Sequence, residues 1–215
     1  MRYSYARMLF DLERYSETES KVWALVNDYY QLFALSAEDV VGKNHSEIRE
    51  KLPAGVRLEE LKHLADCLDL YAQARNAQNK ESGLARLHAV KFFEISGAVS
   101  SVVRVGQDAV DELLNLTHDA QGARQFMEND LLPTIQRYRL FDYLIQVRSQ
   151  YAVVLAYCGN IEKANKEISQ LDAFVDTLQG DKLLEFKTQK HMIAEIAKGN
   201  IKLGYRRQLS GSSPV

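Results

Sequence analysis

A histidine and an aspartate stand side by side at His118 and Asp119, and they are the residues of this chain best suited to metal chemistry. His88 lies upstream of the pair, and Asp142 and Asp172 lie downstream. Imidazole nitrogens and carboxylate oxygens can hold a divalent metal whose open coordination position activates a water molecule for hydrolysis. The same residue types are also common in the turn at a helix end, so the pair has a purely structural interpretation as well.

A histidine, then a His-Asp pair, then a distant aspartate resembles the HD class of metal-dependent phosphohydrolases. In that family an apolar residue, a glycine and a lysine follow the pair, whereas residues 120–123 have the sequence AQGA. We therefore expect that the chain is not an enzyme. An HD-type metal-dependent phosphohydrolase is kept as the alternative function.

The sequence has no other motif that binds a phosphate, a nucleotide or a structural metal. It lacks Gly-x-x-x-x-Gly-Lys-[Ser/Thr], Gly-x-Gly-x-x-Gly, His-Glu-x-x-His and Cys-x-x-Cys. No cofactor and no metal site are expected. The two cysteines, Cys67 and Cys158, lie on apolar helical stripes, as small buried side chains do in a reducing compartment, so we expect a cytoplasmic protein.

The composition favours long helices as the elements that position these residues. Only three residues are proline, and Ala, Leu, Glu, Lys and Gln recur along the whole chain. No segment alternates polar and apolar residues over the length of a strand, and no run of about 18 apolar residues could span a membrane. We predict an all-α fold with no membrane span.

The charge distribution argues against a nucleic acid as the partner. The formal net charge is −2, which does not attract polyanions. Residues 182–207 are locally basic, with seven Lys or Arg residues against two Glu residues. Such a run is usually a solvated helix face, and no known nucleic-acid motif accompanies it, so we do not expect nucleic-acid binding.

Two predicted helices end with the same tripeptide, Gly-Asn-Ile, at residues 159–161 and 199–201. The tripeptides are 40 residues apart, and repetition at this scale is typical of stacked helical units. Glycine tolerates the positive φ that ends a helix, and the asparagine is expected to cap the next helix. A third turn is predicted near residue 14, where Ser16 and Glu19 would form a capping box.

These three turns resemble the tetratricopeptide repeat, a helix–turn–helix unit of about 34 residues. Residues 149–174 match best, through Leu155, Gly159 and Ala164, while residues 3–28 have Glu13 in place of the family glycine. The resemblance covers about a third of the chain and does not extend to residues 38–148. It implies a right-handed α-solenoid of antiparallel helix pairs with an irregular middle.

We predict a single helical repeat domain over residues 1–209, followed by a disordered tail at 210–215. The parts expected to be repeat-like are residues 3–35, 134–178 and 182–209. The longest predicted helix begins at Pro133, because proline is tolerated in a first turn, and continues to Cys158. The later predicted helices cover residues 161–178, 182–198 and 201–209.

The resemblance to tetratricopeptide repeats implies a non-catalytic scaffold or sensor module that binds a protein or peptide. Such a module can also be the partner-binding part of a larger regulator. In the family the ligand lies in a groove lined by the first helix of each pair. The partner-binding positions carried over to this chain are Tyr3, Arg7, Phe10, Gln146, Ser149, Val153, Tyr157, Gln189 and Ile193.

The first predicted helix is apolar over much of its surface, with Tyr5, Met8, Leu9 and Phe10 among its residues. Burying one large apolar side chain is worth about 1.5–3 kcal/mol, so several of them should be covered. We expect the helix to lie in an interface, most simply a homodimer, or beside a neighbouring repeat of a longer protein. Packing against residues 38–70 of the same chain is the remaining possibility.

Overall fold

The computed structural model of the 215-residue chain describes residues 2–203. Every regular element among these residues is helical and none is a strand, which confirms the all-α prediction. No helix in this part of the chain is long and apolar enough to cross a membrane. Residues 201–203 are not helical, and the rest of the last predicted helix and the predicted tail at 210–215 lie outside the described residues.

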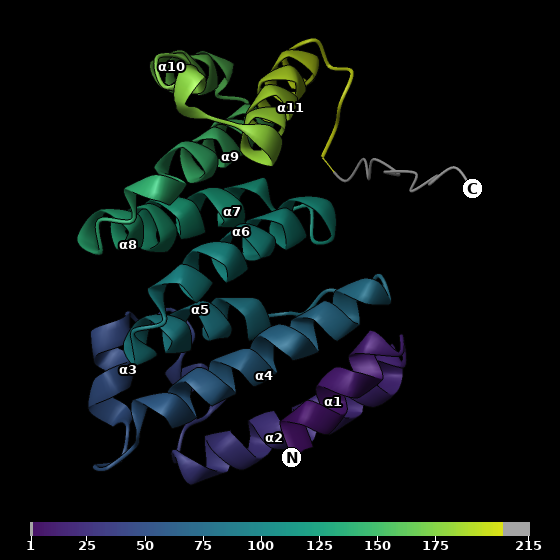
Figure 1. The fold of residues 1–215 in the computed structure, drawn as a ribbon, viewed down its shortest axis with the longest axis vertical. Helices are drawn as coiled ribbons and strands as arrows, with labels where there is room; N and C mark the ends of the chain where they lie inside the picture. The colour runs from purple at the N-terminus through teal and green to yellow at the C-terminus, as the bar shows by residue number, and fades with distance from the viewer. Residues whose placement is uncertain (1, 204–215) are drawn as a thin grey trace. The chain divides into compact units, whose positions relative to one another are not determined.

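The helices group into two compact units, which are described separately (Figure 1). Of the described residues, unit 1 contains 2–112 and 133–140, and unit 2 contains 113–132 and 141–203. Each unit is thus assembled from two separate segments of the chain. The single domain over residues 1–209 and the right-handed solenoid stay predictions.

Unit 1 is organised around its longest helix, α4. Its elements are α1 (Arg2–Asp11), α2 (Tyr15–Leu32), the short η1 (Ala37–Asp39), α3 (His45–Lys51), α4 (Leu58–Ala77), α5 (Ala85–Ser96), most of α6 (Val99–Asn115) and most of α8 (Leu132–Arg137). Helix α4 packs against both α2 and α5 and lies between them in Figure 1. Helix α1 packs on α2 and also touches α4.

The core of unit 1 follows from the apolar spacing of α4. Leu61, Leu64 and Leu68 recur at helical intervals, and each is at most 2% exposed. Phe92 of α5 is also fully buried, and its ring centroid lies 6.3 Å from that of Tyr30 in α2. Burial of each such side chain contributes about 1.5–3 kcal/mol to stability. This core holds α2 in place, and α1 packs on α2.

Unit 2 is organised around α9. Its elements are the end of α6, α7 (Ala120–Phe126), the π-helical η2 (Met127–Leu131), the short η3 (Phe141–Tyr143), α9 (Leu144–Tyr157), α10 (Ile161–Asp172), the short η4 (Val175–Thr177) and α11 (Gly180–Ala197). Helix α9 packs against α7, α10 and α11. Val147 and residues 149–156 are all buried, which is the pattern of a central helix covered on every side.

The two glycine turns form as predicted, but the asparagines do not cap. Gly159 and Gly199 have φ values of +79° and +75°. Asn160 makes no side-chain hydrogen bond that caps α10, and its backbone (φ −90°, ψ 57°) lies outside the extended conformation usual for an N-cap residue. Asn200 instead donates through Nδ2 to Glu195 at 2.8 Å. These turns therefore rest on the positive φ of the glycine and on backbone hydrogen bonds, in which the amides of Asn160 and Asn200 donate to the carbonyls of Leu155 and Glu195, each at 2.9 Å.

The predicted capping box at the start of α2 is wrong. Helix α2 begins at Tyr15, so Ser16 already lies inside the first turn and cannot cap it. The Ser16 hydroxyl instead donates to Gln78 at 2.9 Å, and Glu19 accepts from Arg75 at 2.6 Å. Both side chains tie α2 to the end of α4.

The single long helix predicted over residues 133–158 is also wrong, because α8 ends at Arg137 and α9 begins at Leu144. Arg139 has a φ of +55°. The Leu140 amide donates to the Ile135 carbonyl at 3.0 Å and the Arg139 amide donates to that of Gln136 at 3.3 Å. These are the two hydrogen bonds of a Schellman motif, and an arginine holds the position that usually belongs to glycine.

Candidate functional site

Helix α1 and Leu12, the residue directly after it, whose amide still donates to the Met8 carbonyl at 3.0 Å, expose a row of three large apolar side chains, here called the α1 stripe. Tyr5, Met8 and Leu12 are 46%, 47% and 59% exposed. Their spacing of three and four residues places them on one side of the helix. Ala6 and Leu9, on the adjoining side of α1, are fully buried and hold the helix in unit 1.

Of the three positions predicted on this helix, Tyr3 and Phe10 are half-buried by contacts within unit 1. The ring of Tyr3 meets that of His63 in α4 at a centroid distance of 5.1 Å, and burial raises the pKa of Tyr3 to about 12. The ring of Phe10 meets that of Tyr15 at 5.3 Å. These contacts anchor α1, and they show that residues 58–77 do cover part of its apolar surface.

Arg7, the third predicted position on α1, remains exposed. Its guanidinium lies 5.2 Å from the centre of the Phe10 ring and 3.2 Å from the carboxylate of Asp11. Such a pair on one helix is worth only a few tenths of a kcal/mol in water. Both charges therefore stay available to another molecule at little cost.

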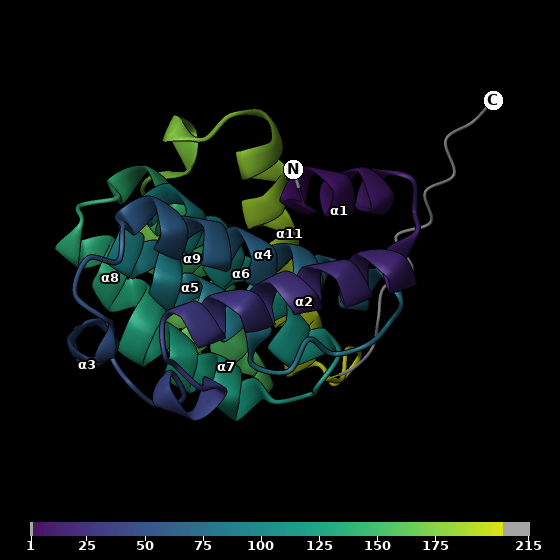
Figure 2. The ribbon, with the colours of Figure 1, turned by 90° about the horizontal axis from the view of Figure 1, so that it is seen from below.

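An open hollow adjoins the first turn of α1. Its lining residues are Arg2, Leu25, Asp28, Tyr29 and Leu32. Arg2 of α1 bridges to Asp28 of α2 at 2.6 Å. Figure 2 shows α1 beside α2 at this place. The α1 stripe and the hollow together are called the α1–α2 surface below.

The predicted positions on the two other helices come together, but inside unit 2. Ser149 and Val153 of α9 and Gln189 and Ile193 of α11 are buried. They lie where α9 packs against α11, so they offer little surface to a partner. Tyr157, the last residue of α9, is half-buried. Their role in partner binding stays a prediction.

Gln146, the remaining predicted position, takes part in a hydrogen-bonded cluster between these helices. Its Nε2 donates to Glu185 at 2.8 Å, and Nε2 of Gln189 donates to the other carboxylate oxygen at 3.3 Å. Burial raises the pKa of Glu185, while the bond from Gln146 and the charge of Lys182 oppose that shift. The adjoining cavity of about 10 Å³ has room for about one water molecule, which excludes a peptide.

The His118–Asp119 pair serves as turn chemistry in unit 2. His118 has a φ of +57°, and the Asp119 carboxylate accepts a hydrogen bond from the Gly122 amide at 2.7 Å, capping α7. Asp172 pairs with Lys190 at 2.7 Å. Within residues 2–203 no three His, Cys, Asp or Glu side chains converge as a metal site would require. This geometry lends no support to the hydrolase alternative.

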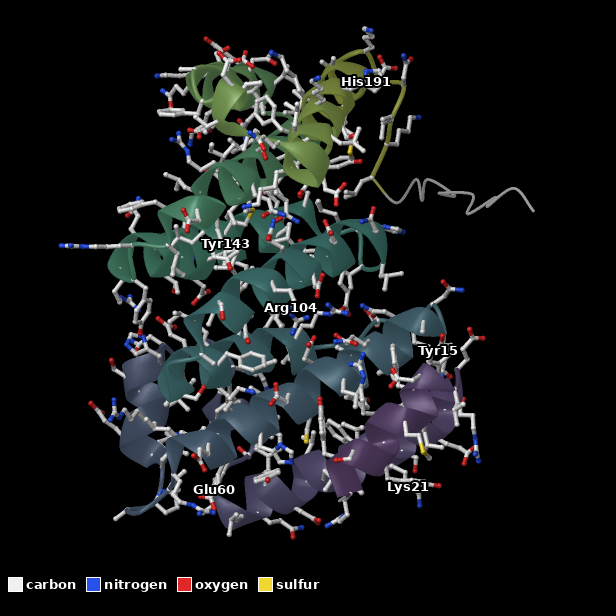
Figure 3. All side chains as sticks on the ribbon, viewed as in Figure 1. Tyr15, Lys21, Glu60, Arg104, Tyr143 and His191 are labelled. Atoms are coloured by element: carbon white, nitrogen blue, oxygen red, sulfur yellow. The ribbon has the colours of Figure 1, made fainter. Side chains whose placement is uncertain are left out.

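Sequence reasoning did not find the buried ionic network of unit 1. Arg86 of α5 pairs with Glu112 at 3.2 Å and with Asp108 at 3.0 Å, both on α6. Arg104 of α6, labelled in Figure 3, pairs with Asp69 of α4 at 2.8 Å. The sequence does contain a signal for this network, because charged residues at 104, 108 and 112 are four apart and therefore share one side of a helix. Asp69 Oδ1 is buried without a hydrogen-bond partner, but each charged side chain named here has an ion-pair partner, so the network is structural and joins α4, α5 and α6.

The α1–α2 surface is the place where predicted partner-binding residues remain next to exposed apolar side chains. Arg7 is exposed beside the α1 stripe, and the half-buried Tyr3 and Phe10 anchor the same helix to unit 1. The positions on α9 and α11 are occupied by packing within unit 2.

Neither models of protein families, nor curated proteins, nor solved structures match this chain.

Proposed function

We propose that this protein is a non-catalytic scaffold or sensor that binds another protein or a peptide through the α1–α2 surface. The observation that carries the proposal is the α1 stripe. Single exposed apolar residues are ordinary on soluble proteins, whereas several large ones gathered on one face mark an interaction site. On α2, Leu32 is 62% exposed and lines the hollow beside the first turn of α1.

The surface is ready to bind without a rearrangement of unit 1. Helix α1 is held on its adjoining, buried side by Ala6, Leu9 and the Tyr3–His63 contact. A preformed surface loses little conformational freedom when it binds, which favours affinity. The charges of Arg2, Asp28 and Arg7 would form its polar rim.

The proposed tetratricopeptide-like character rests on helix hairpins such as α9–α10, which turn at Gly159. A solenoid of such pairs would leave its first helices to meet a ligand. In this chain the corresponding faces of α9 and α11 pack on each other, so the proposal assigns binding to α1 and α2. A cytoplasmic location is proposed with it, because Cys67 and Cys158 are both free thiols.

A displayed library of random peptides tests this function. The wild-type chain would be used for selection, and the enriched peptides would then be measured against a Met8→Glu/Leu12→Glu variant. Both positions are exposed, so the variant keeps its core and should fold. Two charges placed in the stripe should weaken binding by at least about tenfold, since each buried apolar contact is worth about 1.5–3 kcal/mol.

Leu184→Glu is the matched control, because Leu184 is an equally large apolar residue, 66% exposed, on α11 of unit 2. It should bind the enriched peptides as the wild type does. A selection that enriches no peptide, or peptides that bind the double variant as well as the wild type, would contradict the proposal.

A further inference from the structure

We propose that the partner of the α1 stripe is a second copy of this chain, with the two α1 helices packed antiparallel about a two-fold axis. The proposal rests on the proposed function, because it names the occupant of the same surface. Two observations carry the proposal, namely the apolar character of the stripe and the order of the charges beside it.

Arg7 and Asp11 lie on one flank of the α1 stripe. A helix advances about 100° per residue, so two residues four apart share a side, and that side borders Met8 and Leu12. Both side chains are well exposed, 46% for Arg7 and 59% for Asp11. The flank thus presents a positive charge followed, one turn later, by a negative charge.

A two-fold axis near Met8 and Leu9 makes this order self-complementary. In an antiparallel pair related by such an axis, the same flanks face each other with reversed direction. Arg7 of one copy then lies opposite Asp11 of the other, and the same pair forms a second time. Tyr5 of each copy lies opposite Leu12 of its mate, and the two Met8 side chains meet near the axis.

A parallel two-fold pair would lose this complementarity, because its axis runs along the helices and places the flank of Arg7 and Asp11 on opposite sides of the interface in the two copies. The opposite charges of the two copies would then not face each other. The antiparallel pair also shields the apolar side chains of both copies at once. Since each copy contributes only three of them, we expect a weak dimer with a dissociation constant on the order of 10 µM, as small interfaces generally give.

Two charge variants of the full-length chain test the arrangement. Arg7→Glu makes the flank wholly acidic, and Asp11→Arg makes it wholly basic. Sedimentation velocity would be run on each variant alone and on their equimolar mixture. Each variant alone should dimerise at least about tenfold more weakly than the wild type, because two attractive pairs become repulsive. The mixture should regain the dimer, because acidic and basic flanks then face each other.

Lys190→Glu is the matched control, since it reverses one charge of the exposed ion pair between Lys190 of α11 and Asp172 of α10 and should leave the dimer unchanged. A wild-type chain that sediments as a monomer at about ten times the expected dissociation constant would overturn the dimer. So would a mixture that associates no better than either variant alone. If peptides still bind the monomeric chain through Met8 and Leu12, the proposed function stands and the occupant is another protein.

Discussion

At the residue scale, unit 1 buries two polar side chains, Glu112 and His88, which differ in the number of their hydrogen-bond partners. Glu112 accepts hydrogen bonds from the Ser82 hydroxyl at 2.8 Å and from Asn76 at 3.1 Å, and it pairs with Arg86. His88 has only the hydroxyl of Tyr30, 2.8 Å from its Nδ1, and its Nε2 is buried with no hydrogen-bond partner. The carboxylate thus has several hydrogen-bond partners, whereas burial favours the neutral form of the imidazole.

The burial of His88 predicts a loss of stability in weak acid. Burial lowers the pKa of His88 from 6.5 to about 4, so the unfolded chain binds this proton more readily than the folded chain. The stabilisation is complete above the unfolded pKa and is lost as the pH falls from 6.5 toward 4. Between pH 7 and pH 5 the free energy of unfolding should drop by about 2 kcal/mol through this group.

Urea unfolding of wild type and His88→Asn at the two pH values measures this contribution. The variant lacks the titrating group, so its loss between pH 7 and pH 5 should be smaller by about 2 kcal/mol. His191→Asn is the control, because His191 is exposed on α11, and it should keep the wild-type loss. Equal losses in wild type and His88→Asn would show that His88 is not responsible.

At the element scale, the helix ends rely on residues with positive φ, and these are of two kinds. Gly159 and Gly97 take this conformation without a Cβ, whereas Arg139, Glu13 and Ala34 take it with one. The hydrogen bonds of the turn are equally complete at Gly159 and Arg139. The glycine turns are therefore relaxed, and the others hold backbone strain that the packing of the units offsets.

This difference predicts opposite effects of two substitutions. Gly159→Val should lower the free energy of unfolding by about 1–2 kcal/mol, because a residue with a Cβ disfavours positive φ. A Cβ at Gly159 meets no atom within 4 Å, so the cost would be backbone strain alone. Arg139→Gly should raise stability by up to about 1 kcal/mol, because it relieves the same strain. Urea midpoints of both variants against wild type provide the measurement, and a shift of the same sign in both would refute the argument.

At the scale of the whole molecule, each unit has a core of its own. Leu68 of α4 is fully buried in unit 1, and Leu155 of α9 is fully buried in unit 2. The one tryptophan of the sequence, Trp23, lies on α2, where its ring stacks on that of Tyr71 at a centroid distance of 4.8 Å. Tryptophan fluorescence therefore follows unit 1, while circular dichroism follows the helices of both units.

Two core variants should separate the unfolding of the units. Leu68→Ala and Leu155→Ala each leave a cavity that costs about 2–5 kcal/mol. We expect Leu68→Ala to lower the urea midpoint seen by fluorescence, and Leu155→Ala to lower part of the dichroism transition while fluorescence stays unchanged. If both variants shift both signals together, the chain unfolds as one cooperative body.

The features that depend on local physics could be predicted from the amino-acid sequence. The scarcity of proline and the helical spacing of Leu61, Leu64 and Leu68 were enough for the all-α class. The positive φ of Gly159 and Gly199 could be predicted because a helix end favours glycine whatever surrounds it. The apolar character of α1 was visible for the same reason, since it needs only the residues of one helix.

Tertiary structure alone decided which of these residues are accessible. Ser149, Val153 and Ile193 carry the repeat pattern, but the packing of α9 on α11 buries them, and no local pattern specifies that neighbour. The positive φ of Arg139 breaks the long apolar stripe after Pro133, although arginine itself favours helix. On α1, burial of Leu9 and exposure of Met8 follow from where α2 and α4 lie. Exposure depends on contacts between segments distant in sequence, whereas helix formation depends mainly on neighbours within a few residues.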